Sequence, residues 1–200
     1  MAFNFNLDRN NIYTEGAEKL PTDQAYVCKI IAAKEVDQET NGYRIHRLEI
    51  ALDITEGEYA NYYQNRFNAD KERTEDAKWK GVVRLNIPKG DGTEKDGWTM
   101  KTLNTALYNI ETSNAGYTWD NVLEHLKGKA IGLVLRDKEY EINGSTGFYS
   151  EPFKLITVQD AKDQKFRKPA VKYLANKSTP ATPSEGFVPI PDTDLEEIPF

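Results

Sequence analysis

An alternation of apolar and polar residues at positions 43–54, YRIHRLEIALDI, constrains the fold more than any other feature of this sequence. Every second residue in its last part is a large aliphatic one, namely Leu48, Ile50, Leu52 and Ile54. A period of two residues is typical of a half-buried strand, because successive side chains point to opposite faces of a sheet. We therefore expect a sheet with one face in the core and one open face, and Arg47 falls on the open face.

Four further stretches have the β-branched and aromatic composition of strands, and they lie at 25–36, 82–87, 130–140 and 148–158. A hairpin loop at 38–42 would join the first two strands. Asn143-Gly144 is a strong turn signal between the last two, because both turn residues need a positive φ. Arg84 lies in the third strand and is expected, like Arg47, on the open face.

Helices are expected between these strands. Residues 56–78 are polar and helix-permissive, with aromatic residues at helical spacing, namely Tyr59, Tyr62, Tyr63 and Phe67. Thr99 has the position of an N-cap for a second helix, whose apolar face would consist of Met100, Leu103, Leu107 and Ile110. A short helix is expected at 119–126. The pattern predicts a mainly β fold with α insertions, which suits a small, partly open five-stranded oligonucleotide-binding (OB) barrel and also other α+β folds.

The composition changes at position 175. Residues 175–200 contain five of the nine prolines and one basic residue against five acidic ones, a net charge of −4 out of the −6 of the whole chain. A segment with so little apolar surface cannot offset its ordering entropy, so we expect a disordered tail. Residues 1–174 then form one folded domain, with a net charge of −2 that neither excludes nor demonstrates a basic patch.

Several observations predict a cytoplasmic protein. The single cysteine, Cys28, cannot form an intramolecular disulfide, which fits a reducing compartment, and we expect it to be a buried apolar thiol. No apolar run reaches the roughly 18 residues that would span a bilayer, so no membrane association is expected. The first residues, MAFNFN, lack the pattern of a signal peptide.

The residues that could carry catalysis are few. Metal sites of the Cys/His type need three or four ligands, whereas the chain offers only Cys28, His46 and His125, and we expect structural roles for both histidines. No GxGxxG or GxxxxGK[ST] motif is present. The acidic residues at 72–76 alternate with basic ones, as on a solvated helix face. We therefore expect no enzyme activity, no metal and no cofactor.

Basic and aromatic residues occur together in three places, and this combination is typical of single-strand binding. Cations follow the phosphates, and bases stack on aromatic rings for about 1–3 kcal/mol each. The alternative interpretation is that most of these rings are core residues and that the cations pair with neighbouring acids. The candidate nucleic-acid-binding residues are Tyr43, Arg44, Arg47, Arg66, Phe67, Lys78, Trp79, Lys80, Arg84, Arg136, Lys138, Tyr140, Phe148 and Tyr149.

The last residues have the composition of a short protein-binding motif. Phe200 could fill an apolar pocket, its carboxylate could pair with a basic residue at the rim, and Pro199 lowers the ordering cost. The acidic residues would steer the tail towards a basic partner surface. The alternative is an acidic solubilising tail. The candidate partner-binding residues are Asp194, Leu195, Glu196, Glu197, Ile198, Pro199 and Phe200.

Two resemblances bear on function. The ending DLEEIPF resembles the acidic DDDIPF-type tip of bacterial single-stranded-DNA-binding proteins, with Glu196 and Glu197 in place of aspartates. Other segments resemble phage-encoded single-stranded-DNA-binding proteins of Gram-positive hosts, namely GEYANYYQNRF (57–67), KWKGVVRLNIPKGDGTEKDGW (78–98), LKGKAIGLVLRDKEYEINGSTGF (126–148) and FRKPAVK (166–172). The resemblance implies an OB fold that binds single-stranded DNA, in the host cytoplasm, and a tip that recruits replication, recombination or repair proteins.

The sequence thus predicts a non-catalytic single-stranded-DNA-binding protein acting in phage DNA replication and recombination. Formation of a homo-oligomer is left open. One rival is an OB-like interaction adaptor or inhibitor without a nucleic-acid groove. The other is a nuclease subunit that uses Asp or Glu with Mg²⁺, which would require converging carboxylates that no spacing here indicates.

Overall fold

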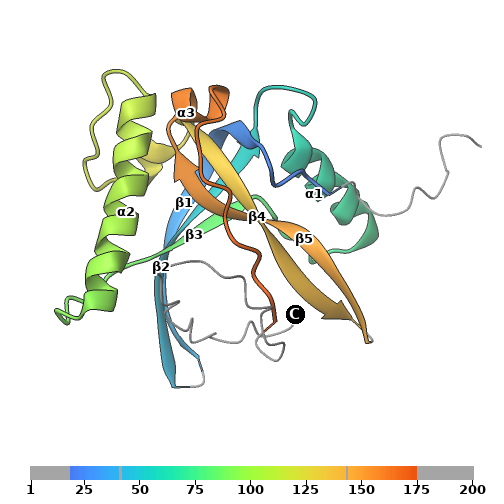
Figure 1. Cartoon of the computed structure of the whole chain (residues 1–200), viewed down its shortest axis with the longest axis horizontal. Coiled ribbons are helices and arrows are strands. Elements are labelled where there is room, and N and C mark those ends of the chain that lie inside the picture. Colours follow the sequence, from blue (N-terminus) through green and yellow to red (C-terminus); the bar gives the residue numbers. More distant parts are fainter. Residues whose placement is uncertain (1–18, 41, 143, 175–200) are drawn as a thin grey trace, which may run out of the picture.

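Five strands form one antiparallel sheet in the computed structural model, which describes residues 19–40, 42–142 and 144–174. The strands are β1 (Ala25–Thr40), β2 (Tyr43–Ile54), β3 (Val82–Asn86), β4 (Ala130–Ile142) and β5 (Ser145–Ile156). Their order across the sheet is β3-β2-β1-β4-β5 (Figure 1). The expected mainly β fold is confirmed, and all five expected strands are present.

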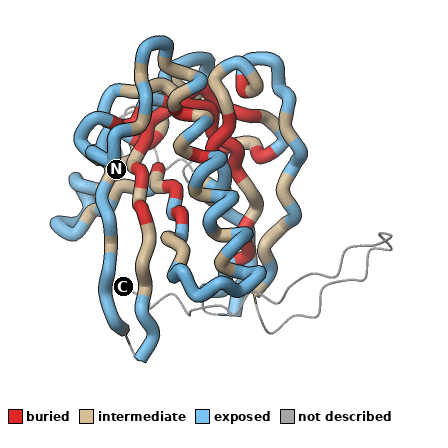
Figure 2. The backbone as a smooth tube through the Cα atoms, turned by 90° about the vertical axis from the view of Figure 1, so that its left-hand side faces the viewer, coloured by how far each residue is buried: buried red, intermediate tan, exposed pale blue. Residues whose placement is uncertain are grey.

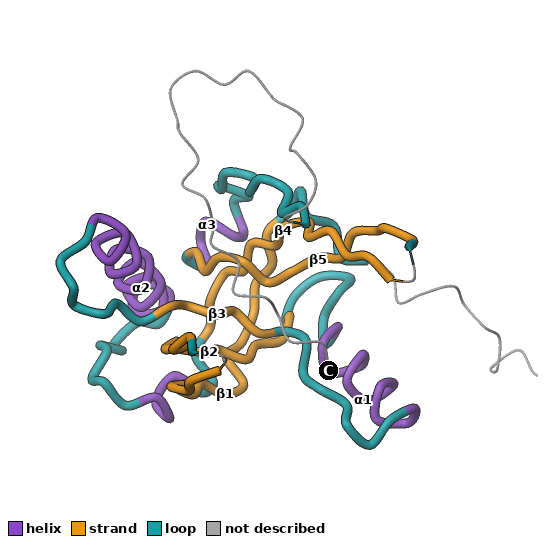
Figure 3. Tube along the Cα trace, turned by 90° about the horizontal axis from the view of Figure 1, so that it is seen from below, coloured by secondary structure: helices purple, strands orange, loops and turns teal. Residues whose placement is uncertain are grey.

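The sheet curls without closing into a barrel. The outer strands β3 and β5 are in contact, but they share no hydrogen-bonded ladder among the described residues. Seen from below, β3 lies between the β1–β2 pair and β5 (Figure 3). This topology is compatible with an OB-like fold, and the described residues do not close the sheet into a barrel.

The core lies on one face of the sheet, as the alternation in β2 predicts. The four aliphatic residues of β2 are between 0 and 4% exposed, and Val83 and Leu85 of β3 lie directly opposite Ile50 and Leu48. Burying one such side chain stabilises the fold by about 1.5–3 kcal/mol. Cys28 is buried with them, so the expected apolar thiol is confirmed, and burial raises the pKa of the Cys28 thiol.

The helices differ from the expectations at their boundaries. They are α1 (Tyr62–Arg73), α2 (Glu94–Ser113), the 3-10 helix η1 (Leu123–Leu126) and α3 (Val158–Lys162). The expectation of helix throughout 56–78 was too long, and the helix expected at 119–126 is reduced to one 3-10 turn. The short α3 was not foreseen, although Thr157 and Asp160 form the N-cap pattern that could have revealed it.

The predicted cap and part of the predicted face of α2 are wrong. Thr93, not Thr99, caps the helix, because its hydroxyl accepts a 3.2 Å hydrogen bond from the Asp96 backbone N–H. Met100 is 43% exposed, since it lies about 80° around the helix from the buried Ile110. Ala106, which was not among the predicted face residues, is buried together with Ile110.

Two long hairpin arms extend from the sheet, and each begins at a bulge. The β1–β2 ladder is irregular between Ile30 and Ala32, and the β4–β5 ladder is irregular between Val134 and Leu135. Bulges bend a strand and increase its twist, so the hairpins leave the sheet in different directions (Figure 1). We call residues 32–51 the β1–β2 arm and residues 135–153 the β4–β5 arm, excluding in each case the undescribed turn residue.

Both arms end in a two-residue turn. Thr40 pairs with Tyr43, so the first loop is shorter than the expected 38–42, and β1 extends beyond position 36. Ile142 pairs with Ser145, which confirms a hairpin at 143–144, and Gly144 has a φ of 78°. The role expected of Asn143 lies outside the described residues. In the β1–β2 arm, β1 is mostly exposed and β2 is mostly half-buried, whereas buried residues gather near the base (Figure 2).

The two ends of the described chain hold the β4–β5 arm. Near one end, the Thr22 hydroxyl donates a 2.8 Å hydrogen bond to Asp137, and Lys19 forms an ion pair with the same carboxylate. At the other end, Lys172 exchanges backbone hydrogen bonds of 2.8 and 2.9 Å with Glu139 and Asp137. No described helix combines the length and apolarity needed to cross a bilayer.

Candidate nucleic-acid interface

A row of charged side chains crosses three neighbouring strands on the open face of the sheet. Lys34 of β1 pairs in register with Glu49 of β2, and Glu49 pairs in register with Arg84 of β3. Arg47 lies two residues before Glu49 and therefore on the same face. We call these four residues the Glu49 cluster. The expectation that Arg47 and Arg84 share the open face is confirmed.

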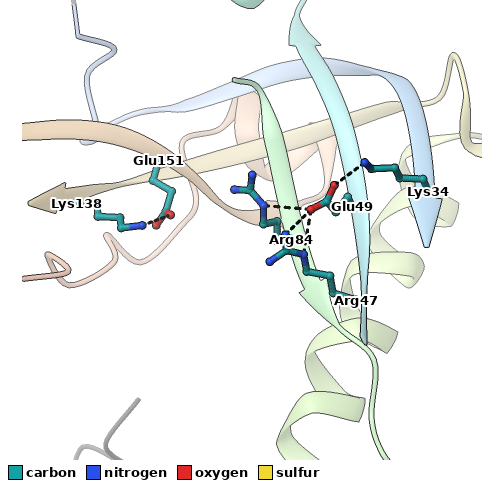
Figure 4. A network of polar contacts seen from close by, with 6 residues as sticks. All are labelled: Lys34, Arg47, Glu49, Arg84, Lys138 and Glu151. Carbon is teal, nitrogen blue, oxygen red and sulfur yellow. Dashed lines mark hydrogen bonds and ion pairs between the residues drawn. The ribbon is translucent and has the colours of Figure 1, made fainter. Parts of the chain in front are cut away.

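The Glu49 carboxylate is the centre of this cluster (Figure 4). Its Oε1 accepts from Arg47 Nη2 at 2.7 Å and from Arg84 Nε at 3.3 Å, and its Oε2 is 3.3 Å from Lys34 Nζ. Burial alone would raise the pKa of Glu49, but Arg47, Lys34 and Arg84 together hold that pKa below its usual value. Three cations around one ionised carboxylate leave an excess of two positive charges on this face.

A second carboxylate-centred group lies on the β4–β5 arm. Arg136 Nε donates to Glu151 at 2.6 Å, and Lys138 Nζ is 3.3 Å from the other Glu151 oxygen. Register explains the arrangement, because Arg136 is directly opposite Glu151 and Lys138 is the next residue along the same face. We call these three residues the Glu151 cluster.

Aromatic rings follow the Glu151 cluster along the same arm. The Arg136 guanidinium lies 4.5 Å from the centre of the Phe153 ring, and Lys138 Nζ lies 5.7 Å from that of Tyr149. The Tyr149 ring is 6.3 Å from that of Tyr140. Phe153, Tyr149 and Tyr140 are each 38 or 39% exposed, and we call these three residues the aromatic stripe. The exposed rings provide the stacking contact that a single strand needs, and the cations between them add positive charge beside the rings.

The two clusters belong to neighbouring parts of the open surface. In Figure 4 the Arg84 guanidinium extends from β3 towards the side on which Lys138 and Glu151 lie. The strand that carries Arg84 is in contact with the strand that carries Glu151. β3 and β5 therefore share no ladder where they meet, and the cations and rings of the two clusters lie on these strands and their neighbours.

The predicted residues at the tip of the β1–β2 arm lie on different faces. Tyr43 is 61% exposed and shares its face with Arg47 by alternation. Arg44 points to the other face, where it forms a two-pronged ion pair with Asp37 at 2.7 and 2.8 Å. Hydrogen bonding from Arg44 lowers the pKa of Asp37. The structure thus brings Tyr43, but not Arg44, to the face of the Glu49 cluster.

The predicted group around α1 lies at the opposite end of β2. Trp79 packs its ring 5.6 Å from Phe67 and donates its indole N–H to the Leu52 carbonyl at 3.1 Å. Arg66 donates to the Tyr62 hydroxyl at 3.3 Å. Trp79 is half-buried against the core, so its ring fixes the segment between α1 and β3. Lys78 and Lys80, on either side of it, are exposed.

Phe148 is separated from the aromatic stripe. It lies next to Tyr149 in β5, so its side chain points to the other face of the arm. There its ring makes an edge contact with Tyr173 at 6.0 Å. Of the predicted residues on this arm, four lie together on one face: Arg136, Lys138, Tyr140 and Tyr149.

Sequence reasoning missed the residues that organise the site. Glu49 and Glu151 were not among the candidates because acids were considered only as neutralising partners, and Lys34 and Phe153 were not singled out. Alternation places Glu49 on the face of Arg47, and this signal was available. The partnership with Lys34 depends on the register of β1, which shifts at the bulge and was not predictable.

The histidines have local carboxylate partners. His46 Nε2 is 2.6 Å from Glu35, and His125 Nδ1 is 2.6 Å from Asp120. The proximity of His125 lowers the pKa of Asp120. Within the described part of the chain, no three His, Cys, Asp or Glu side chains gather where they could hold a metal ion.

The remaining predicted residues, Asp194–Phe200, and the tail predicted at 175–200 lie outside the described residues. Comparison with known proteins adds no further constraint: no protein-family model matches this chain, and no curated protein matches it.

Proposed function

We propose that this protein binds single-stranded DNA, with little sequence preference, on the open surface formed by the Glu49 cluster, the Glu151 cluster and the aromatic stripe. One observation carries the proposal: two cation groups and three exposed rings lie on strands that are neighbours in space. Cations without rings would suit duplex or RNA backbone equally, whereas exposed rings favour unpaired bases. The resemblance to phage-encoded proteins supports a role in phage DNA replication and recombination.

The contact chemistry follows from this geometry. Arg47 and Arg84 present guanidinium groups, which bind phosphate oxygens in a planar, two-pronged manner. Tyr149, Tyr140 and Phe153 offer faces on which bases stack. None of these contacts reads a base edge, so the affinity is expected to depend on salt and only weakly on sequence.

A titration of fluorescent oligo-dT against salt tests the proposal. We expect tight binding to the single strand, weaker binding to duplex of equal length, and a negative slope of log affinity against log salt. Arg47→Gln combined with Arg84→Gln should lower the affinity and make the slope shallower by about 1.4, since each phosphate contact contributes about 0.7. Equal affinity for duplex, or an unchanged slope in the double variant, would contradict the proposal.

The matched control removes the same charge elsewhere. Arg73→Gln combined with Lys162→Gln changes exposed residues of α1 and α3 that belong to neither cluster. We expect its affinity to stay close to that of the parent protein. A loss equal to that of the cluster variant would indicate a general charge effect.

A second candidate function is an OB-like interaction adaptor without nucleic-acid binding. The observation in its favour is that the predicted arginines of both arms already pair with carboxylates, as Arg44 does with Asp37 and Arg136 with Glu151. This candidate predicts no binding in the oligo-dT titration at low salt.

We further propose that residues Asp194–Phe200 recruit a replication, recombination or repair protein, and the support for this is the sequence of the segment. Deletion of Phe200 should abolish capture of such a partner while the oligo-dT affinity stays unchanged. If both activities fall together, Phe200 contributes to the DNA-binding domain instead.

A further inference from the structure

The carboxylate of Glu49 lies beneath the cations that it holds. The Glu49 side chain is 12% exposed, whereas those of Lys34 and Arg84 are 70 and 45% exposed and that of Arg47 is 27% exposed. Its partners therefore face solvent, where a bound strand would run, and the acid forms the floor of the cluster.

The contacts that Glu49 makes are those that a phosphate would make. Two carboxylate oxygens accept from two guanidinium groups and one ammonium group at 2.7–3.3 Å. Arginine recognises carboxylate and phosphate through the same planar fork of donors. An arriving phosphate therefore competes with Glu49 for the same three cations.

The Glu151 cluster provides an internal contrast. Glu151 is 14% exposed, but its partners Arg136 and Lys138 are also only 18 and 11% exposed. All three side chains are thus packed into the arm together. Removing one partner from a group of this kind leaves a poorly solvated charge. We therefore expect Glu151 to stabilise the folded β4–β5 arm.

We propose that Glu49 is an internal competitor of DNA phosphate: it holds Lys34, Arg47 and Arg84 while the surface is empty and lowers the affinity for the strand. Binding then transfers these cations from the carboxylate to phosphate. This inference rests on the proposed function and names what limits the affinity at that site. In the free protein, the negative charge of Glu49 offsets the repulsion among the three neighbouring cations and fixes their positions.

Glu49→Gln tests the competition, because it removes the charge and keeps the shape of the side chain. We expect the oligo-dT affinity at low salt to rise about three- to tenfold, which matches the loss of one unscreened repulsion at close range. The slope of log affinity against log salt should steepen by about 0.7. Glu35→Gln is the matched control, because Glu35 lies on the same arm with its side chain on the other face, paired with His46.

A double variant separates competition from a general change in charge. If Glu49 acts through the cations that it holds, the gain from Glu49→Gln should be smaller in protein that also carries Arg84→Gln. An equal gain in both backgrounds, or an equal gain from Glu35→Gln, would overturn the proposal. An unchanged or lower affinity of the Glu49→Gln protein would overturn it as well.

A variant with a shorter carboxylate provides a second test in case the Glu49→Gln protein does not fold. Glu49→Asp keeps the charge but draws the oxygens back by one methylene group, so it holds Arg84 and Lys34 less closely. The affinity should rise while the salt slope stays the same, and no rise would count against the competition. If the parent protein itself does not bind oligo-dT, the proposed function fails; if it binds and the Glu49 variants show no gain, only this inference fails.

Discussion

The two hairpin arms have the same architecture and are held in different ways. Each begins at a bulge, ends in a two-residue turn and carries a carboxylate-centred cluster. The β4–β5 arm is held by Lys19, Thr22 and Lys172, and its ion pairs are packed inside it. The β1–β2 arm is held at its base by β3, which pairs with residues 47–51, whereas among the described residues its tip (38–45) pairs only within itself, and its cations Lys34 and Arg44 are exposed.

This difference separates two tasks that a strand-binding surface must combine. Rings have to be presented at fixed positions for bases to stack on them, and the anchored arm carries the aromatic stripe. Cations that exchange one anion for another need access to solvent, and the Glu49 cluster lies where the base of the β1–β2 arm pairs with β3, with Lys34 and Arg84 70 and 45% exposed. The rings that stack and the cations that exchange therefore lie on different parts of the sheet.

The largest effect is expected from the base of the anchored arm. Leu135 is fully buried where the β4–β5 arm begins, so Leu135→Ala should lower the free energy of unfolding by about 2–5 kcal/mol. Ile45 lies half-buried in the β1–β2 arm, and Ile45→Ala should cost less than about 1.5 kcal/mol. Urea denaturation of both variants measures the difference, and similar losses would show that the arms are equally integrated.

The next effect concerns stacking. Tyr149→Leu removes a ring from the anchored arm and should weaken oligo-dT binding by about 1–3 kcal/mol. Tyr43→Leu removes an exposed ring from the tip of the other arm and should cause a smaller loss. Fluorescence titrations of the two variants, with thermal melts to verify folding, test this order. A larger loss for Tyr43→Leu would reverse the assignment of the stripe.

A smaller effect is expected in acid. Burial opposes ionisation of Asp137, but hydrogen bonds from Lys19 and Thr22 hold its pKa below the usual value. A carboxyl whose pKa is lowered on folding contributes stability above the unfolded pKa of about 3.9, and this contribution is lost as the pH falls through the folded pKa. The parent protein should therefore lose stability more steeply below about pH 4 than Asp137→Asn. Thermal melts from pH 6 to pH 2 measure this, and parallel curves would mean that the arm does not depend on Asp137.

The smallest effect is expected from the exposed pair of the other arm. Hydrogen bonding between Arg44 and Asp37 raises the pKa of Arg44 and lowers that of Asp37. Both side chains are open to solvent, which screens their interaction. Arg44→Gln should leave the melting temperature unchanged within error at moderate salt. A clear decrease would show that the β1–β2 arm relies on its charged face as the other arm does.

Much of the sheet was predictable from local pattern, and the site was predictable only in part. Alternation identified the core face of β2 and the open-face positions of Arg47 and Arg84, because a strand's period is fixed by its backbone. The turn at 143–144 followed from one dipeptide. The bulges near Ile31 and Phe153 have no local signature of this kind, so the register that joins Lys34 to Glu49 had to come from the structure. Trp79 was predicted to stack on bases because composition alone does not distinguish an exposed ring from one that packs on the core.

The positions of Lys19 and Leu174, where the described residues begin and end, have a consequence for protein engineering. Lys19 contacts Asp137, and the Leu174 backbone N–H donates to Glu139 two residues further along β4. In a protein shortened to residues 19–174, a short linker between positions 174 and 19 would therefore close the domain into a ring, and new ends could be opened at 41–42 without cutting any strand pair. Such a circular permutant would keep the sheet order and would leave the β1–β2 arm as two separate terminal strands.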